Sequence, residues 1–360
     1  MELIIILLVL AAIALGLEDI YRRCWSRGLK LNLTFSKKEA LVGETVELKE
    51  VVANTNRIFM PYIELKYQIR NNGDEYESQQ ELFSLISRQK VTRTLEFPCE
   101  KRGVCEIDQI YVISRGLFLR KMYDFHARSR SRLMIYPRLL DVSQIGLRAL
   151  VPAGEEKSEL RIMEDPFSYR GVKEYGSADT MNRINWNATA QTGRLMANTY
   201  EDTRSLAVKL VVQLPDVRVE GAEDLCETSI SLAASLFMKL HQEQCPVSMI
   251  SNGKDAMTGF PVFLAERADH LYEKVILETF SRIDAENLEE GQKLSVSAGT
   301  TLVLLAPPES ENRSLVQQAL EYGVRGGKVL WIVMGKSNAD FVKAVEKLRG
   351  RYAGIQMEIY

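Results

Sequence analysis

The chain has 360 residues, and 46% of them are hydrophobic, which is enough apolar material to bury the cores of two or three domains. Its 46 Lys and Arg residues nearly balance its 48 Asp and Glu residues, so the formal net charge is -2. This balance argues against nucleic acid or a strongly acidic substrate as the partner.

An uninterrupted apolar run occupies residues 3–17. As a helix it would measure about 22 Å, which spans a hydrocarbon core of roughly 30 Å only if its flanks contribute. Basic residues follow the run at Arg22, Arg23, Arg27 and Lys30. The positive-inside rule then places the bulk of the chain in the cytoplasm. We predict a single-pass anchor of the cell membrane over residues 1–21, with Tyr21 and Trp25 in the interface belt.

A cleaved secretory signal and a buried core helix are the alternatives to an anchor. Residues 12–14 (Ala-Ile-Ala) resemble a small-residue cleavage site, but the chain lacks a basic segment before the run. The five cysteines are odd in number and have no metal-site spacing, as expected in a reducing compartment. Cys99 and Cys105 would pair only in an exported chain and are otherwise two ordinary strand thiols.

Short runs with period-two alternation fill residues 31–140, for example at 31–35, at 46–53 and in PYIELKYQIR. Turn residues separate them, including Gly43 and the Lys-Arg-Gly of residues 101–103. Six to eight strands at this spacing predict a β-sandwich of immunoglobulin-like outline.

Residues 201–360 follow a different pattern, in which near-continuous apolar strands alternate with amphipathic helices. The first strand is expected at 207–214 and the next at 246–250, with a helix between them. Helices and strands then alternate to the C-terminus. This order predicts a parallel sheet covered on both faces, which is a doubly wound α/β domain.

The connecting segment, residues 141–200, is too polar for a core and too rich in Trp, Tyr and Arg for a flexible linker. Asp179 is placed to cap a short helix over residues 180–186, and Gly193 is placed to end the turn region. Glu164 and Asp165 are read as a solvated turn before Pro166 rather than as a catalytic pair.

No sequence motif marks a reaction centre. The first turn of the α/β part, LPDVRVEGAED, lacks the glycines and the lysine of a phosphate loop, and the Gly-Lys pair within residues 251–254 is a weak match. The histidines at 126, 241 and 270 are scattered without partners at metal-ligand or catalytic spacing. We therefore predict no catalytic residue, no metal and no cofactor.

Residues 170–196 carry a family pattern. RGVKEY is followed by Asp179, Arg183, Ile184 and Trp186, and then by Ala188, Thr189, Ala190 and the sequence GRLM. This resembles the signature of the bacterial domain-of-unknown-function family number 58. ALVGETVELKEVVANTN, RGVCEIDQIYVISRGLF and IYPRL resemble the ends of that family's β-domain. The sequence departs from the pattern at Ala178, Asn187 and Gln191, where the family has glycine, lysine and arginine.

The resemblance implies a membrane-anchored protein whose C-terminal part is similar to a von Willebrand factor A domain. Such proteins are often encoded beside MoxR-type AAA+ ATPases and transglutaminase-like membrane proteins. The metal-adhesion motif of these domains would lie at residues 213–218, QLPDVR, which offer one carboxylate and no serine. Because a hard cation needs several oxygen ligands, the site is expected to hold no metal.

Two interpretations of the motif remain open. It is either a polar knuckle that pins the β-domain to the sheet or a surface on which a partner docks, since Trp, Tyr and Arg are typical hot-spot residues. The candidate residues for partner docking in this motif are Arg170, Tyr175, Asp179, Arg183, Trp186, Thr189 and Leu195.

Three functions follow from these features. The first is a non-enzymatic, membrane-anchored scaffold or adaptor for an AAA+ ATPase in assembly or envelope-related processes. The second is a hydrolase or transferase acting on envelope material, with Glu164, Asp179 and Arg183 meeting at the domain junction. The third is an exported adhesion module, which requires the signal-peptide interpretation.

Overall fold

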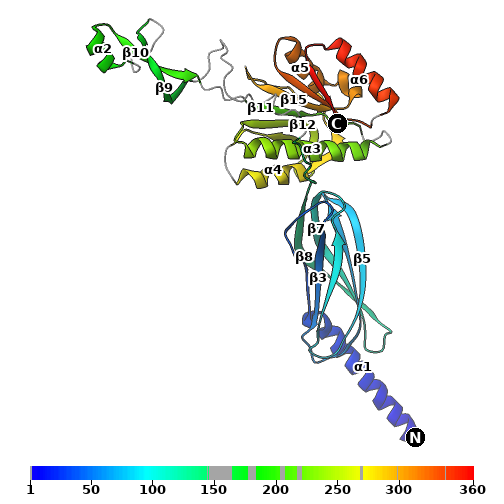
Figure 1. Cartoon of the computed structure of the whole chain (residues 1–360). Helices are drawn as coiled ribbons and strands as arrows, with labels where there is room; N and C mark the ends of the chain where they lie inside the picture. Colours follow the sequence, from blue (N-terminus) through cyan, green and yellow to red (C-terminus); the bar gives the residue numbers. More distant parts are fainter. Residues whose placement is uncertain are drawn as a thin grey trace.

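The computed structural model describes residues 2–143, 145, 164–176, 184–202, 207–216, 221–267, 271–297, 299–336 and 338–360. A long N-terminal helix leads into a β-sandwich, and the sandwich meets an α/β domain at its other end (Figure 1). A separate β-hairpin stands away from the ribbons of both domains in the same view. The mixed α/β architecture with an apolar N-terminal helix is therefore confirmed.

Helix α1 (Glu2–Gly28) contains the apolar run and continues directly into the first strand. Within the described residues it is the one helix that is long and apolar enough to cross a membrane. Its first part is exposed, whereas Tyr21 and Trp25 are buried in the core of the sandwich. The prediction that these two aromatic residues lie in the membrane interface belt is thus wrong, because they pack against protein. The helix also extends beyond the expected end of the anchor at residue 21.

Two sheets form the sandwich. One contains β1 (Leu29–Phe35), β3 (Thr45–Asn54) and β6 (Lys90–Pro98), in the order β1-β3-β6. The other has the order β2-β8-β7-β4-β5, formed by β2 (Glu39–Leu41), β8 (Met122–Tyr136), β7 (Gly103–Arg115), β4 (Met60–Asn71) and β5 (Asp74–Leu85). Alternate residues of β3 point inward, and both sheets contribute to one apolar core. The predicted β-sandwich is confirmed.

One inward position of β3 carries an acid, Glu50, which is fully buried. The hydroxyl of Tyr67 on β4 donates a hydrogen bond to its carboxylate. Burial raises the pKa of Glu50, and the hydrogen bond from Tyr67 only partly opposes this effect. The pair is therefore a polar contact between the two sheets inside an otherwise apolar core.

The α/β domain is built on a sheet of order β13-β12-β11-β15-β16-β17, in which β14 also pairs with β12. Its parallel strands are β11 (Val208–Val212), β12 (Val247–Asp255), β15 (Thr301–Ala306), β16 (Val329–Val333) and β17 (Gln356–Ile359). The short strands β13 (Pro261–Leu264) and β14 (Ile283–Leu288) pair with β12 in antiparallel fashion, which the sequence did not predict.

Helices cover both faces of this sheet. Helices α3 (Ala222–Gln242) and α4 (Tyr272–Ser281) share one apolar cluster with it. Helices α5 (Ser314–Val324) and α6 (Ala339–Arg351) share a second cluster on the opposite face, beside the short 3-10 helix η3 (Pro308–Asn312). Adjacent residues of β11 enter different clusters, Leu210 the first and Val211 the second. The doubly wound arrangement follows from strands that are apolar on both sides.

The boundary of the α/β domain differs from the expected one. Val142 is buried in the first apolar cluster, and Leu140 and Ile145 pack against it. The backbone amide of Leu140 also donates to the hydroxyl of Ser235 on α3, at 2.8 Å. The beginning of the predicted connecting segment is thus part of the α/β core.

Candidate functional site

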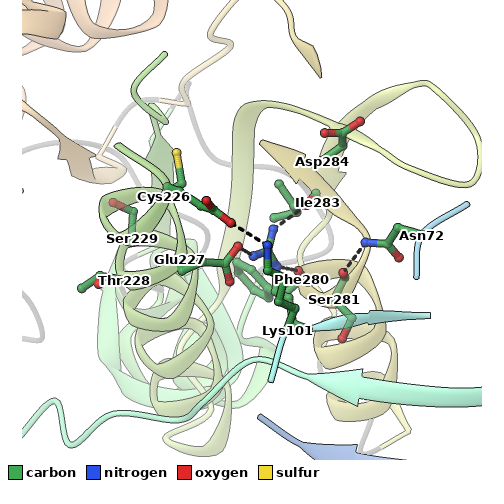
Figure 2. A network of polar contacts seen from close by, with 12 residues as sticks. Asn72, Lys101, Cys226, Glu227, Thr228, Ser229, Phe280, Ser281, Ile283 and Asp284 are labelled. Carbon is green, nitrogen blue, oxygen red and sulfur yellow. Dashed lines mark hydrogen bonds and ion pairs between the residues drawn. The ribbon is translucent and has the colours of Figure 1, made fainter. Parts of the chain in front are cut away.

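Arg102 makes the central contact between the sandwich and the α/β domain. It lies in the turn between β6 and β7, and its Nε and Nη2 atoms donate to the carbonyl oxygens of Phe280, at 3.1 Å, and Ile283, at 2.5 Å. Its Nη1 atom pairs with the carboxylate of Glu227 on α3. The side chain of Arg102 is 5% exposed. Figure 2 shows this network, with Glu227 on one side and Phe280 and Ile283 on the other.

The chemistry of this contact suits a guanidinium. The carbonyl of Phe280 belongs to the last turn of α4, where the helix dipole favours a positive charge. A guanidinium has five donors in a fixed plane, so it can serve two carbonyls and a carboxylate together. Burial lowers the pKa of Arg102 to about 10, so the group remains charged at neutral pH. The buried charge is balanced by acceptors from two helices and one strand.

Peripheral contacts surround Arg102. Lys101 forms an ion pair with Glu223 at 2.8 Å, and Asn72 donates to the carbonyl of Ser281 at 3.4 Å. Gly103 has φ of +145°, and a Cβ there would fall 1.8 Å from Oδ1 of Asn71, so only glycine fits. The exposed ion pair contributes little stability by itself. Together with Asn72 and Gly103, Lys101 shapes the turn around the buried arginine.

Sequence reasoning identified this turn but not its role. An arginine beside a glycine in a turn between strands is normally solvent-exposed, and nothing in CEKRGVC indicates that the turn enters another domain. The sequence of α3 does not mark the partner residue either, because Glu227 occupies a half-exposed position like that of an ordinary residue on a helix surface. Only the assembled fold brings Arg102 to the end of α4.

The described part of the stretch that resembles the family signature lies in the hairpin of β9 (Glu164–Glu174) and β10 (Met196–Asp202), with helix α2 (Trp186–Thr192) between the strands. Asn185 caps α2 by accepting a hydrogen bond from the amide of Ala188 at 3.0 Å. Gly193, which the sequence predicts as the end of the turn region, has φ of +70° and caps the C-terminal end of α2. The expected helix over residues 180–186 is wrong in its described part, because Asn185 is extended and the helix begins at Trp186. Asp179 lies outside the described residues.

Hydrogen bonds of the signature close the hairpin on itself. Thr189 Oγ1 accepts from the amide of Met196 at 3.0 Å, and the amide of Tyr175 donates to the carbonyl of Leu195 at 2.8 Å. Glu174 pairs with Arg194 at 3.0 Å. These contacts give Thr189 and Tyr175 a local structural role within the hairpin.

Two signature side chains face solvent in the described structure. Trp186 is 68% exposed and Leu195 is 47% exposed. No residue of α2 is buried, and the turn from Gly193 to Leu195 is exposed as well, whereas Ala197 on β10 is fully buried. Of Arg170 only the backbone in β9 is described, and Arg183 lies outside the described residues. The structure thus places the contact between the two domains at Arg102 and leaves the largest signature side chain uncovered.

The enzymatic interpretation requires Glu164, Asp179 and Arg183 to converge at the domain junction. The backbone of Glu164 pairs with Asp202 at the base of the hairpin, while the other two residues are not among those described. The described part of the junction contains Arg102 with its acceptors and the peripheral contacts around it, including an ion pair between Glu39 on β2 and Lys274 on α4. It holds a buried cation against carbonyls, an arrangement that offers no activated nucleophile or base.

The carboxyl end of β11 is occupied by internal contacts. The amide of Leu214 donates to Asn252 Oδ1 at 2.8 Å, and Asn252 Nδ2 donates back to the carbonyl of Leu214 at 3.1 Å. The Gly253-Lys254 pair lies within β12 instead of in a loop before a helix. Across the described ranges, no three His, Cys, Asp or Glu residues gather closely enough to hold a metal ion.

No protein-family model and no curated protein matches the chain. Among solved structures, the CARDB domain of a Pyrococcus furiosus protein is 16% identical, covering 28% of this chain and 93% of that domain, with a TM-score of 0.19. The C-terminal domain of wzt is 10% identical, covering 31% of this chain and 75% of that chain, with a TM-score of 0.25. The sporulation control protein Spo0M of Bacillus subtilis is 13% identical, covering 29% and 49%, with a TM-score of 0.19. Likenesses this low carry no argument about function.

Proposed function

We propose that the protein is a non-enzymatic, membrane-anchored scaffold of the family-58 type. Helix α1 anchors it in the cell membrane with the bulk of the chain in the cytoplasm, and the sandwich carries the α/β domain away from the bilayer. A MoxR-type AAA+ ATPase is the proposed partner, with a transglutaminase-like membrane protein as a further component. The process is assembly or an envelope-related function.

The exposure of Trp186 is the observation that carries this proposal. A tryptophan that faces water on a short capped helix exposes a large apolar surface, and such residues dominate the binding energy of many interfaces. Leu195 adds a second exposed apolar side chain to the same hairpin. The described contacts between the domains lie around Arg102, and the hairpin stands apart from the ribbons of both domains (Figure 1), so we assign the hairpin to a partner.

The two domains are consistent with the proposed family. A parallel sheet with two helices on each face suits a von Willebrand A-like domain. A two-sheet sandwich with one shared core suits an immunoglobulin-like domain. The buried arginine between them suits a scaffold, because it holds the α/β domain at a defined angle to the stalk.

The test is crosslinked affinity purification of the full-length chain from native membranes, with and without ATP. The wild type is compared with Trp186→Ala and with a matched control, Phe260→Ala, which removes an aromatic side chain of similar exposure from the turn between β12 and β13. We expect the wild type and the Phe260 variant to retain an AAA+ ATPase that the folded Trp186 variant loses. Wild-type protein that retains no ATPase in either nucleotide state would contradict the scaffold function.

A further inference from the structure

The turn between β7 and β8, residues 116–121, lies beside the point where the apolar part of α1 ends. The carboxylate of Glu18, the first charged residue after the apolar run, touches the backbone of Gly116, where a Cβ would fall 1.8 Å from Glu18 Oε1. The hydroxyl of Tyr123, just after the turn, donates to the same carboxylate at 2.9 Å. The turn is thus at the α1 end of the sandwich, the end farthest from the α/β domain (Figure 1).

This turn exposes apolar side chains. Phe118 and Leu119 are each 52% exposed, and Met122 at the start of β8 is 62% exposed. Leu119 has φ of +59°, a left-handed conformation that is strained for a leucine. The turn is nevertheless well ordered by hydrogen bonds, from the amide of Gly116 to the carbonyl of Lys121 at 2.9 Å and from the amide of Leu119 to the carbonyl of Gly116 at 2.8 Å. A formed turn therefore holds two large apolar side chains outward.

Positive charge surrounds these apolar side chains. Arg120 and Lys121 are exposed in the turn itself. Arg22 and Arg23 are exposed on the adjacent part of α1, where both pair with Asp19 at 2.6 Å. An apolar tip between basic residues matches the two layers of a membrane surface, with acyl chains inside and anionic headgroups outside.

The length of α1 gives an independent reason for membrane contact. The helix is held by the sandwich from Glu18 onward, which leaves residues 2–17 to enter the bilayer. That length is about 24 Å, against a hydrocarbon core of roughly 30 Å. A short span fixed rigidly to a folded domain pulls that domain against the membrane, because the alternative is to thin the bilayer.

We propose that the β7–β8 turn is a second membrane contact, which inserts Phe118 and Leu119 at the boundary between headgroups and acyl chains. Arg120 and Lys121 bind anionic headgroups beside them. The inference rests on the anchor in the proposed function. The sandwich then stands on the bilayer at two points, α1 and the turn, which fixes the tilt of the whole stalk.

The test uses the full-length chain in lipid nanodiscs that contain phosphatidylcholine with or without phosphatidylglycerol. The photo-crosslinker p-benzoylphenylalanine replaces Phe118, Leu10 in the apolar run, or Phe260 in the α/β domain. Lipid adducts are then measured by mass spectrometry after irradiation. We expect lipid adducts at positions 118 and 10 and none at position 260. Replacing Arg120 and Lys121 by Gln should lower the yield at 118 several-fold in the anionic discs, with little change at position 10.

The failures of the two proposals are distinguishable. Adducts at position 10 with none at position 118 would overturn the second contact and leave the anchor in place. Absence of lipid adducts at position 10 would overturn the anchor and, with it, this inference. Crosslinks from position 118 to protein in native membranes, in place of lipid, would also overturn it, because the turn would then be a protein-binding surface.

Discussion

The guanidinium of Arg102, on the sandwich, forms an ion pair with the carboxylate of Glu227, on α3 of the α/β domain. The same guanidinium donates to the carbonyls of Phe280 and Ile283 at and beyond the end of α4. One side chain from the turn that joins the two sheets of the sandwich thus reaches two helices and a strand of the neighbouring domain. Among the described ion pairs between the two domains, this one has the most buried cation, since the side chain of Arg102 is 5% exposed.

Replacing Arg102 with Met is expected to lower the free energy of unfolding by about 2 to 4 kcal/mol, because two carbonyls and a carboxylate lose their donor. The expected loss is smaller than the cost of breaking a fully buried ion pair, because the side chain of Glu227 is 45% exposed and can be hydrated. Urea unfolding of the full-length chain in detergent micelles, followed by the fluorescence of buried Trp331, measures the change.

The matched control is Arg128→Met, which removes an exposed arginine from β8. It should change the free energy of unfolding by no more than about 0.5 kcal/mol. A Glu227→Gln variant should lie between the two, since the carbonyl contacts of Arg102 remain. Equal effects of Arg102→Met and Arg128→Met would mean that the buried network does not hold the domains together.

Trp186→Ala should leave the free energy of unfolding within about 0.5 kcal/mol of the wild type, because an exposed side chain loses little packing. Trp331→Ala is the contrasting variant. Trp331 is fully buried and its Nε1 donates to the carbonyl of Ala306 at 3.1 Å, so its removal should cost about 3 to 5 kcal/mol. Thermal or urea unfolding checks both values. If Trp186→Ala lowered the free energy of unfolding by several kcal/mol, the signature would have a structural role instead of a docking role.

The layers of the fold could be predicted because each has a distinct periodicity. Strands such as β15 are buried along their whole length, so the sequence shows an unbroken apolar run followed by an amphipathic helix. Strands such as β3 alternate inward and outward residues, which is readable as period two. The strands β13 and β14 were missed because they are short and add to an existing strand, so their formation depends on β12.

The site could be predicted only in part. The sequence marks the signature stretch as specific and predicts a break at Gly193, but the bounds of α2 and the exposure of Trp186 depend on how the hairpin is packed. Arg102 carries no local signal, since its acceptors come from α3, α4 and β14. Tyr21 and Trp25 were assigned to the membrane interface because aromatic residues after an apolar run usually lie there. Their burial depends on a sandwich that folds around the end of the helix.

The burial of Trp25 makes a prediction that distinguishes protein packing from a membrane belt. Trp25 is 4% exposed and its ring lies 5.4 Å from that of Phe125 on β8. Trp25→Ala should therefore cost about 3 to 5 kcal/mol of sandwich stability. Ile20→Ala, on the exposed side of the same helix, is the control and should cost far less. Urea unfolding in micelles measures the free energy of unfolding of both variants. Equal, small losses would mean that Trp25 lies at the membrane interface and is not packed in the protein.

The buried acid Glu50 gives the sandwich a pH dependence. Burial raises its pKa in the folded state above the ordinary value of 4.5, so the folded state binds this proton more tightly than the unfolded state. The sandwich therefore gains stability from this group as the pH falls through the folded-state pKa toward 4.5. Above the folded-state pKa, the full cost of burying the ionised carboxylate applies. Glu50→Gln mimics the protonated acid and keeps an acceptor for Tyr67.

We accordingly expect Glu50→Gln to raise the free energy of unfolding at neutral pH and to flatten its pH dependence above 4.5. Denaturant unfolding at a series of pH values measures this. The control is Glu96→Gln, a substitution of an exposed glutamate on β6, which should change the free energy of unfolding by no more than about 0.5 kcal/mol. A steeper dependence in the Glu50 variant would mean that the folded state favours the ionised acid.

The cysteines provide the final prediction, because Cys99 and Cys105 form no disulfide in this fold. Burial raises the pKa of Cys99 to about 11 and of Cys105 to about 12, so at neutral pH both thiols are almost entirely protonated and poorly nucleophilic. Native protein from membranes should thus react with iodoacetamide slowly at both, and unfolded protein should react rapidly without prior reduction. Mass spectrometry of the alkylated peptides follows each thiol. A Cys99–Cys105 disulfide in untreated protein would instead indicate an oxidising compartment and contradict the cytoplasmic placement of the sandwich.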